Sequence, residues 1–162
     1  MNVKLMVMLI SEIYHSHPRT LPVGATIYQA VQELMKDEVN ALVIVDDHHQ
    51  PVGVLSLPDV AAATIPRQFR QNVQMAAAMY RRGFFTEICQ QLKDKPVTEL
   101  MRRSFLTVSR HDNIMTVTAD FLRNDLYLVP VVDDGRLIGV VTRTEIKQAL
   151  LYGMRNLPAH AR

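Results

Sequence analysis

Apolar residues recur with a helical period in two stretches of this chain that lie 87 residues apart. In the first stretch they stand at i, i+3, i+4, i+7 and i+8, which places them on one face of a helix: Ile27, Ala30, Val31, Leu34 and Met35. The second stretch has the same spacing at Ile114, Val117, Thr118, Phe121 and Leu122. Thr26 with Gln29 predicts a capping box for the first helix, and Asn113 is a favourable N-cap for the second. The pattern therefore predicts two equivalent amphipathic helices.

Each predicted helix is followed by two short apolar runs that are rich in β-branched residues. The runs cover 42–45 and 52–55 in the first stretch, and 128–132 and 138–141 in the second. Turn-forming residues separate the runs, and continuous runs of this kind are typical of strands buried on both faces. We also expect short strands at 19–21 and 106–108 and a further helix after each second run. Each copy thus has the predicted order β-α-β-β-α.

The two copies align over most of their length. Residues 10–47 match 97–134 at an offset of 87, and 52–60 match 138–146 at an offset of 86, with eight identities among 47 pairs. A unit of about fifty residues buries its sheet poorly alone. We therefore predict an α+β fold in which two repeats pack with pseudo-twofold symmetry.

Two matching motifs carry a resemblance to a known family. The chain has Gly53-Val-Leu-Ser56-Leu-Pro-Asp59 and Gly139-Val-Val-Thr142-Arg-Thr-Glu145, each where a strand is predicted to lead into a helix. Val97-Thr-Glu-Leu-Met101 and Leu128-Val-Pro-Val-Val-Asp133 add to the pattern. Together these segments resemble a tandem pair of CBS domains, the modules named after cystathionine β-synthase.

The resemblance implies a regulatory module without chemistry of its own. It implies an adenosine-containing ligand in the cleft between the two repeats, with AMP, ADP, ATP and S-adenosylmethionine as candidates and no required cofactor. We expect a first CBS repeat at 1–65, an inserted helical segment at 66–96, a second CBS repeat at 97–154 and a C-terminal tail at 155–162.

The resemblance also assigns roles to particular residues. Ser56 and Thr142 would contact the phosphate or nearby ribose, while Asp59 and Glu145 would take the ribose hydroxyls, since one carboxylate can accept from both. Glu145 is one methylene longer than the usual aspartate, so we expect the better ribose acceptor at Asp59 and the better phosphate partner at Arg143. The base pocket would be lined near Thr20, Val43, Thr107 and Pro130.

A different interpretation of the same motifs stays open. Ser56-x-x-Asp59 and Thr142-x-x-Glu145 are also ordinary capping boxes, so the chain could be a ligand-free dimeric scaffold. An enzyme has little support, because no nucleophile-elbow, P-loop or dinucleotide motif occurs and Cys89 stands among apolar residues. The six histidines lack the spacing of a metal site, so no metal is expected.

Composition adds one feature, the distribution of charge. The chain is 48% hydrophobic and 21% charged with a net charge of +2. Two bases stand against seven acids in 10–60, whereas six stand against two in 61–96. Complementary segments of this kind favour association, so we expect a homodimer with 66–96 at or near its interface; the alternative is that 66–96 covers the first repeat within one chain. The regulatory role that the resemblance implies adds a separate effector protein as a partner. No apolar run is long enough for a membrane helix, and the arginine pairs lack interleaved aromatic residues, so we expect a cytoplasmic protein without membrane or nucleic-acid partners.

The inserted segment has its own pattern. Pro66 can begin a helix, Gly83 interrupts the apolar stripe that runs from Phe69 to Tyr80, and Pro96 ends the segment. We predict a helical hairpin or a kinked helix. The pairs Arg81-Arg82 and Arg102-Arg103 are basic, and arginine pairs are normally solvated surface. A contact of Arg102 or Arg103 with a ligand phosphate is the alternative hypothesis for the second pair.

Overall fold

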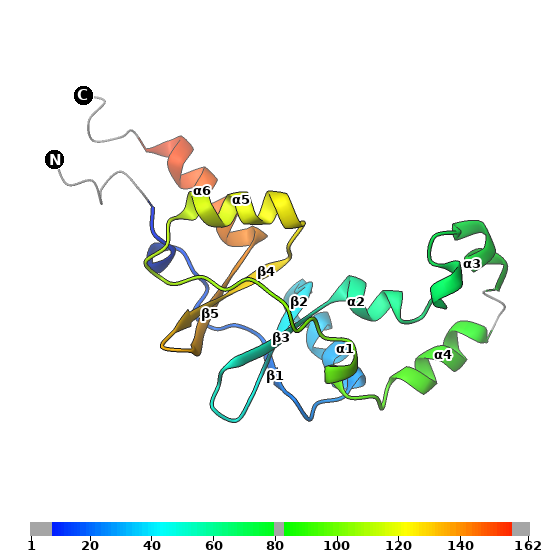
Figure 1. The fold of residues 1–162 in the computed structure, drawn as a ribbon. Coiled ribbons are helices and arrows are strands. Elements are labelled where there is room, and N and C mark those ends of the chain that lie inside the picture. Colours follow the sequence, from blue (N-terminus) through cyan, green and yellow to red (C-terminus); the bar gives the residue numbers. More distant parts are fainter. Residues whose placement is uncertain (1–7, 80–82, 157–162) are drawn as a thin grey trace. The chain divides into compact units, whose positions relative to one another are not determined.

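The computed structural model describes residues 8–79 and 83–156 of the chain, and it combines helices with short strands (Figure 1). The α-helices are α1 (Ile27–Met35), α2 (Leu57–Ala62), α3 (Val73–Met79), α4 (Phe84–Leu92), α5 (Ile114–Asn124) and α6 (Arg143–Arg155). The strands are β1 (Thr20–Pro22), β2 (Ala41–Val45), β3 (Pro51–Ser56), β4 (Leu128–Asp133) and β5 (Arg136–Thr142). Short 3-10 helices cover Ile10–Glu12, Lys36–Glu38, Arg67–Phe69 and Val97–Glu99. The predicted α+β class is confirmed.

The contacts within the chain define two compact units. The first-repeat unit comprises residues 19–47 and 52–104, and the second-repeat unit comprises 1–18, 48–51 and 105–162. Each unit contains the helix and paired strands of one predicted repeat together with a short segment from another part of the sequence.

The sheet of the first-repeat unit has the order β1-β2-β3. Strand β1 runs parallel to β2, with Thr20 opposite Val43. All residues of β2 are buried, as the continuous apolar run predicts. This register brings two of the predicted base-pocket positions side by side.

In the second-repeat unit, β4 and β5 form an antiparallel pair in which Leu128 faces Thr142. The strand predicted at 106–108 is reduced to a single parallel bridge between Val108 and Val131. Only Val108 of that run is buried, while Leu106 and Thr107 are exposed and make no strand pairing. The prediction of a full strand there was wrong, because apolar residues alone do not supply a paired edge.

The two amphipathic helices form where the pattern predicts them, and their caps are confirmed. Thr26 accepts a hydrogen bond from the Gln29 amide at 3.2 Å, and Asn113 accepts one from Thr116 at 2.9 Å. The buried stripe is narrower than expected, however. Met35 of α1 and Leu122 of α5 are 78% and 84% exposed. A helix against one small sheet buries a single stripe, so the flanking apolar positions face outward.

Each repeat is completed by a segment that precedes the other repeat in the sequence. Ile10 is fully buried in the core of the second-repeat unit, and Val97 is fully buried in the core of the first-repeat unit. The hydrogen bonds match in the two units: Val97 N to Ala25 O and Ile27 N to Lys95 O in one, Ile10 N to Asp112 O and Ile114 N to Met8 O in the other. The compact units therefore differ from the predicted boundaries, because 8–18 and 97–104 fill the cores.

The inserted segment is helical, as predicted. Gly83 adopts φ 97°, the left-handed region that favours glycine, and α4 begins directly after it. Leu92 at the end of α4 is buried in the core of the first-repeat unit. Tyr80, Arg81 and Arg82 lie outside the described residues. Among the helices described, from α1 to α6, we find none long and apolar enough to cross a membrane.

Candidate functional site

The first motif lies where β3 leads into α2, and a crossing segment covers its glycine. A Cβ atom on Gly53 would overlap the side chain of Met101. Next to this contact, Val54 and Arg102 exchange two backbone hydrogen bonds, of 3.0 Å and 2.8 Å. Glycine is therefore needed here so that the 101–102 segment can lie directly across the strand.

Ser56 and Asp59 form a reciprocal capping box at the start of α2. Asp59 Oδ2 accepts from the Ser56 amide at 3.0 Å and from the Ser56 hydroxyl at 2.7 Å, and Ser56 Oγ accepts from the Asp59 amide at 3.3 Å. Ser56 is only 5% exposed, and the Asp59 side chain is 12% exposed. The motif therefore caps α2, independently of any role toward a ligand.

Arg102 supplies the remaining described partner of Asp59. Its Nε lies 2.9 Å from Asp59 Oδ1, and its side chain is 63% exposed. Arg103 instead donates to the Thr98 carbonyl at 3.3 Å. The sequence pattern grouped the two arginines and did not predict the pairing with Asp59, because 43 residues separate the two.

The second motif repeats this arrangement with different side chains. A Cβ atom on Gly139 would overlap the His15 carbonyl and the Tyr14 ring. Val140 and His15 exchange backbone hydrogen bonds of 2.9 Å and 3.0 Å. At the offset of 87, His15 occupies the position that Arg102 occupies in the first-repeat unit.

Thr142 and Glu145 cap α6 in the same way. Glu145 Oε2 accepts from the Thr142 amide at 2.8 Å and from the Thr142 hydroxyl, and Thr142 Oγ1 accepts from the Thr144 amide at 3.2 Å. Glu145 is only 5% exposed. Its longer side chain folds back onto the cap, so it has less access to solvent than Asp59.

Arg143, the predicted phosphate partner, is directed to the loop before β4. It donates to Asp125 Oδ1 at 3.0 Å and to the Leu126 carbonyl at 3.3 Å, and its guanidinium lies 4.8 Å from the centre of the Tyr127 ring. These contacts orient Arg143 for a role in holding that loop. Its phosphate role stays a prediction.

The four predicted base-pocket positions form two pairs. Thr20 lies opposite Val43 in the β1–β2 register, and Val43 is fully buried. In the second-repeat unit the exposed Thr107 precedes Val108, whose amide donates to the Pro130 carbonyl at 3.0 Å. The predicted base-pocket residues therefore lie at corresponding backbone positions in the two repeats. Their roles toward a ligand stay predictions.

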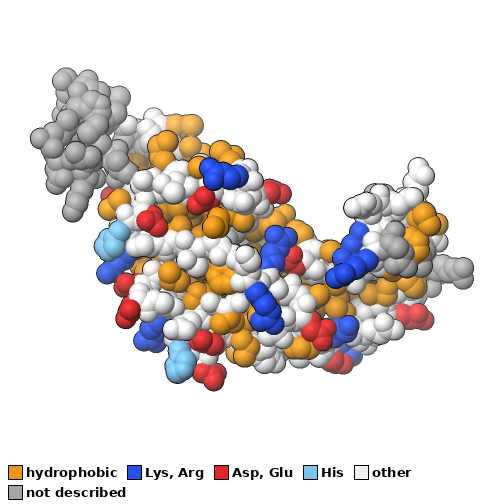
Figure 2. Space-filling model, in the orientation of Figure 1, with side chains coloured by type: hydrophobic (Ala, Val, Ile, Leu, Met, Phe, Trp, Pro, Cys, Tyr) orange, Lys and Arg blue, Asp and Glu red, His pale blue; other side chains and the backbone are white. Residues whose placement is uncertain are grey.

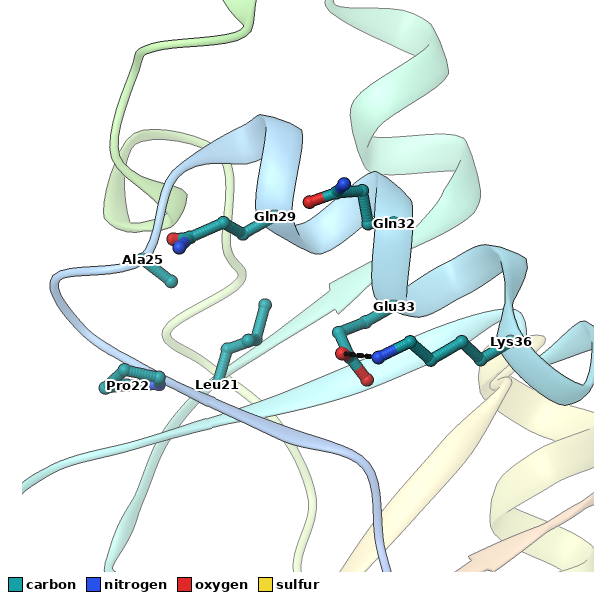
Figure 3. Close-up of a pocket in the computed structure, with 7 residues that line it drawn as sticks. All are labelled: Leu21, Pro22, Ala25, Gln29, Gln32, Glu33 and Lys36. Carbon is teal, nitrogen blue, oxygen red and sulfur yellow. Dashed lines mark hydrogen bonds and ion pairs between the residues drawn. The ribbon is translucent and has the colours of Figure 1, made fainter.

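A pocket of about 320 Å³ lies beside β1 and α1, outside the predicted site (Figure 3). Three of its polar side chains have partners: Gln29 accepts from the Thr26 amide, and Glu33 pairs with Lys36 at 2.6 Å. The hydrogen bond from Lys36 lowers the pKa of Glu33 below its usual value. Its lining is Leu21, Pro22, Ala25, Gln29, Gln32, Glu33 and Lys36.

Metal-ligating side chains do not cluster in the described ranges 8–79 and 83–156, where no group of three or more His, Cys, Asp or Glu could hold an ion. Cys89 lies on α4 and is half-buried. The described motif side chains include two carboxylates, two hydroxyls and the exposed guanidinium groups of Arg102 and Arg143.

The paired repeats, with a glycine under a crossing segment and a capped carboxylate in each, define the class of CBS-domain modules. The CBS domain model matches residues 10–65 and 97–152. The chain belongs to the CBS domain family, as its motifs predict.

Several known proteins are similar to this chain in sequence or in fold. The chain is 27% identical over 146 residues to the L-aspartate semialdehyde sulfurtransferase of Methanocaldococcus jannaschii, covering 90% of this chain but only 23% of that protein. It is 26% identical to the CBS domain pair of protein MJ0100, whose structure contains 5′-methylthioadenosine and S-adenosyl-L-methionine, with a TM-score of 0.67 and coverage of 93% and 99%.

A plant protein has a similar fold. CBSX2 from Arabidopsis thaliana has 23% identity and a TM-score of 0.73, covering 93% of this chain and 99% of that one. A structure of CBSX2 in complex with AMP has a TM-score of 0.68, with 92% and 99% covered.

Proposed function

We propose that this chain is a non-catalytic regulatory module that binds an adenine nucleotide or related adenosyl ligand and passes the signal to a partner protein. The observation that carries the proposal is the Ser56–Asp59 pair at the end of β3, within a complete CBS repeat. Asp59 is the carboxylate that the resemblance assigns to the ribose, and Ser56 is the matching hydroxyl. A ligand held between the repeats stays a prediction from the resemblance.

The ligands of similar proteins support this chemistry. The MJ0100 domain pair is in complex with 5′-methylthioadenosine and S-adenosyl-L-methionine, and CBSX2 is in complex with AMP. All three ligands contain adenosine, so a ribose diol is their shared feature. The sulfurtransferase relative does not argue for an enzyme, because this chain matches 23% of its length.

A thermal-shift panel tests the proposal. The chain is heated with AMP, ADP, ATP, S-adenosylmethionine or NAD, and a true ligand at about a hundred times its Kd stabilises the fold by about 2.7 kcal/mol. We expect at least one adenosyl compound to raise Tm, and Asp59→Ala to remove that rise while the variant stays folded. A panel without any shift would overturn the proposal.

A second candidate function rests on the caps themselves. Both motif carboxylates are held by their own capping boxes, in the first repeat by Ser56 and in the second by Thr142. Such an arrangement is sufficient to explain the motifs in a ligand-free dimeric scaffold. The scaffold predicts no nucleotide-dependent shift in any variant, whereas the sensor predicts one that depends on Asp59.

We further propose that the chain forms a homodimer. Exposed apolar side chains stand at matching positions of the two repeats, Tyr28 and Met35 on α1 and Met115 and Leu122 on α5. Figure 2 shows hydrophobic side chains on the surface over α5 and α6. A second copy would carry the same exposed apolar side chains on α1 and α5, and self-association would bury them. The charge pattern favours the inserted helices as a further part of this interface.

A further inference from the structure

We propose that Arg102 is a latch on Asp59 that makes the first repeat selective for adenosyl ligands that carry a phosphate. The inference rests on the proposed function and assigns it a specificity-determining residue. Its basis is the ion pair between Arg102 and Asp59, together with the way in which the backbone of Arg102 is held.

The backbone of Arg102 is fixed at the motif. Its amide donates to the Val54 carbonyl at 2.8 Å, and its carbonyl accepts from the Val54 amide at 3.0 Å. Met101 is seated over Gly53, where no Cβ fits. The backbone of Arg102 is therefore held beside the motif, and its side chain is the part that can exchange one partner for another.

The acceptor capacity of Asp59 limits what a ligand can do. A carboxylate oxygen offers about two lone-pair sites. Oδ2 already accepts from the amide and the hydroxyl of Ser56, and Oδ1 accepts from Arg102. One site on Oδ1 remains, whereas a ribose diol donates two hydrogen bonds. A ribose that uses both hydroxyls must therefore displace one existing partner.

Arg102 is the partner that can leave. Ser56 is buried and caps α2, so its release would break the start of the helix. The Arg102 side chain is 63% exposed, so water can take over its hydrogen bonds when it leaves Asp59, whose own side chain is 12% exposed. The ribose thus replaces the guanidinium at Oδ1 while the cap stays intact.

The released guanidinium then distinguishes between ligands. Its five donors fit a phosphate in bidentate geometry, so a nucleotide gives Arg102 a new anionic partner in place of Asp59. A phosphate-free ligand breaks the ion pair between Arg102 and Asp59 and offers Arg102 no anionic partner in place of Asp59. Arg102 should therefore favour a nucleoside phosphate and oppose an uncharged adenosyl compound.

In the described part of the second repeat, no arginine stands at the position that corresponds to Arg102. His15 occupies this position, and the centre of its ring lies 6.2 Å from that of His17. The arginine of the second motif, Arg143, contacts Asp125 and Tyr127. Selectivity through a latch is therefore expected for the first repeat alone.

Isothermal titration calorimetry with AMP and with adenosine tests the latch. We compare the full chain with Arg102→Gln and with Arg103→Gln, a neighbouring exposed arginine that donates to a backbone carbonyl. In Arg102→Gln we expect adenosine to bind about two- to fivefold tighter, since the ion pair no longer competes with the ribose for Asp59. We expect AMP to bind about tenfold weaker, since a charge-assisted bond is lost. Arg103→Gln should change neither.

Arg102→Lys keeps the positive charge and should retain more of the preference for AMP than Arg102→Gln does. Equal weakening of both ligands in Arg102→Gln would overturn the latch, since Arg102 would then only orient Asp59. Unchanged affinities would overturn it as well. Wild-type protein that binds neither AMP nor adenosine would overturn the latch, whereas the proposed function fails only when no compound of the thermal-shift panel binds, which separates the two failures.

Discussion

The carbonyl of His15 lies against Gly139 so closely that it occupies the space in which a Cβ atom would stand. A backbone atom cannot move aside as a side chain can. We therefore expect Gly139→Ala to lower the free energy of unfolding by about 1–3 kcal/mol or more, the usual cost of overpacking. Urea denaturation followed by circular dichroism measures the loss.

Two other glycines provide the comparison. The three atoms nearest to a Cβ on Gly53 all belong to the Met101 side chain, so Gly53→Ala should cost less than Gly139→Ala. Gly153 has open space around it within α6, and Gly153→Ala should stabilise the helix by up to about 1 kcal/mol. Equal losses at Gly53, Gly139 and Gly153 would contradict the close approach of the crossing segments.

Ile10 tests whether the early segment belongs to the core of the second repeat. Its side chain is fully buried among residues such as Val117 and Val129. Ile10→Ala should therefore destabilise the protein by about 2–5 kcal/mol, as deletion of a buried aliphatic side chain does. Ser11→Ala, an exposed change at the next residue, serves as the control. A loss below about 0.5 kcal/mol in Ile10→Ala would show that the segment does not fill that core.

Capping and ligand binding can be separated by a pair of variants. Ser56→Ala and Thr26→Ala each remove the hydroxyl of a capping box, so each should cost about 0.5–2 kcal/mol of stability. Only Ser56 belongs to the predicted site. We expect the nucleotide-induced rise in Tm to shrink in Ser56→Ala and to persist in Thr26→Ala. The same rise in both variants would contradict a ligand contact at Ser56, whereas no rise in either variant or in the wild-type protein would support the scaffold.

The proposed homodimer rests on the exposed apolar side chains that α1 and α5 each carry. We expect the wild-type chain to have the mass of a dimer in light scattering at micromolar concentration. Leu122→Glu places a charge on the exposed face of α5 and should shift the protein toward monomer, whereas Arg123→Gln should not. A monomeric wild-type protein would contradict the proposed dimer.

The elements of the fold were accessible from the sequence because local rules determine them. The helical period gave the positions of α1 and α5, and the buried runs gave β2 and β4. The exposed face at Leu122 was not accessible, because periodicity identifies an apolar stripe without stating how much of it a small sheet can cover. The strand at 106–108 failed for a related reason, since pairing depends on a partner edge.

Of the candidate site, the sequence predicted the two motif residues but not the side chain that pairs with them. The motif identified Ser56 and Asp59 because their spacing of three is a local property. The partner of Asp59 was hidden, because Arg102 reaches it only through the pairing of 101–102 with β3. The alignment of the two repeats contains the relevant signal, because Arg102 and His15 occupy the same aligned position. The segment that crosses each glycine therefore brings a different side chain to each motif.

Titration of AMP into wild-type protein and into Asp59→Asn by calorimetry is the most direct test of the regulatory function. The amide keeps an oxygen that can accept from the Ser56 amide, so the cap and the fold should survive. The account predicts that AMP binds the wild-type chain and that Asp59→Asn weakens binding about tenfold or more, because a charged acceptor for the ribose is lost. Equal binding to both proteins, or no binding to either, would contradict it.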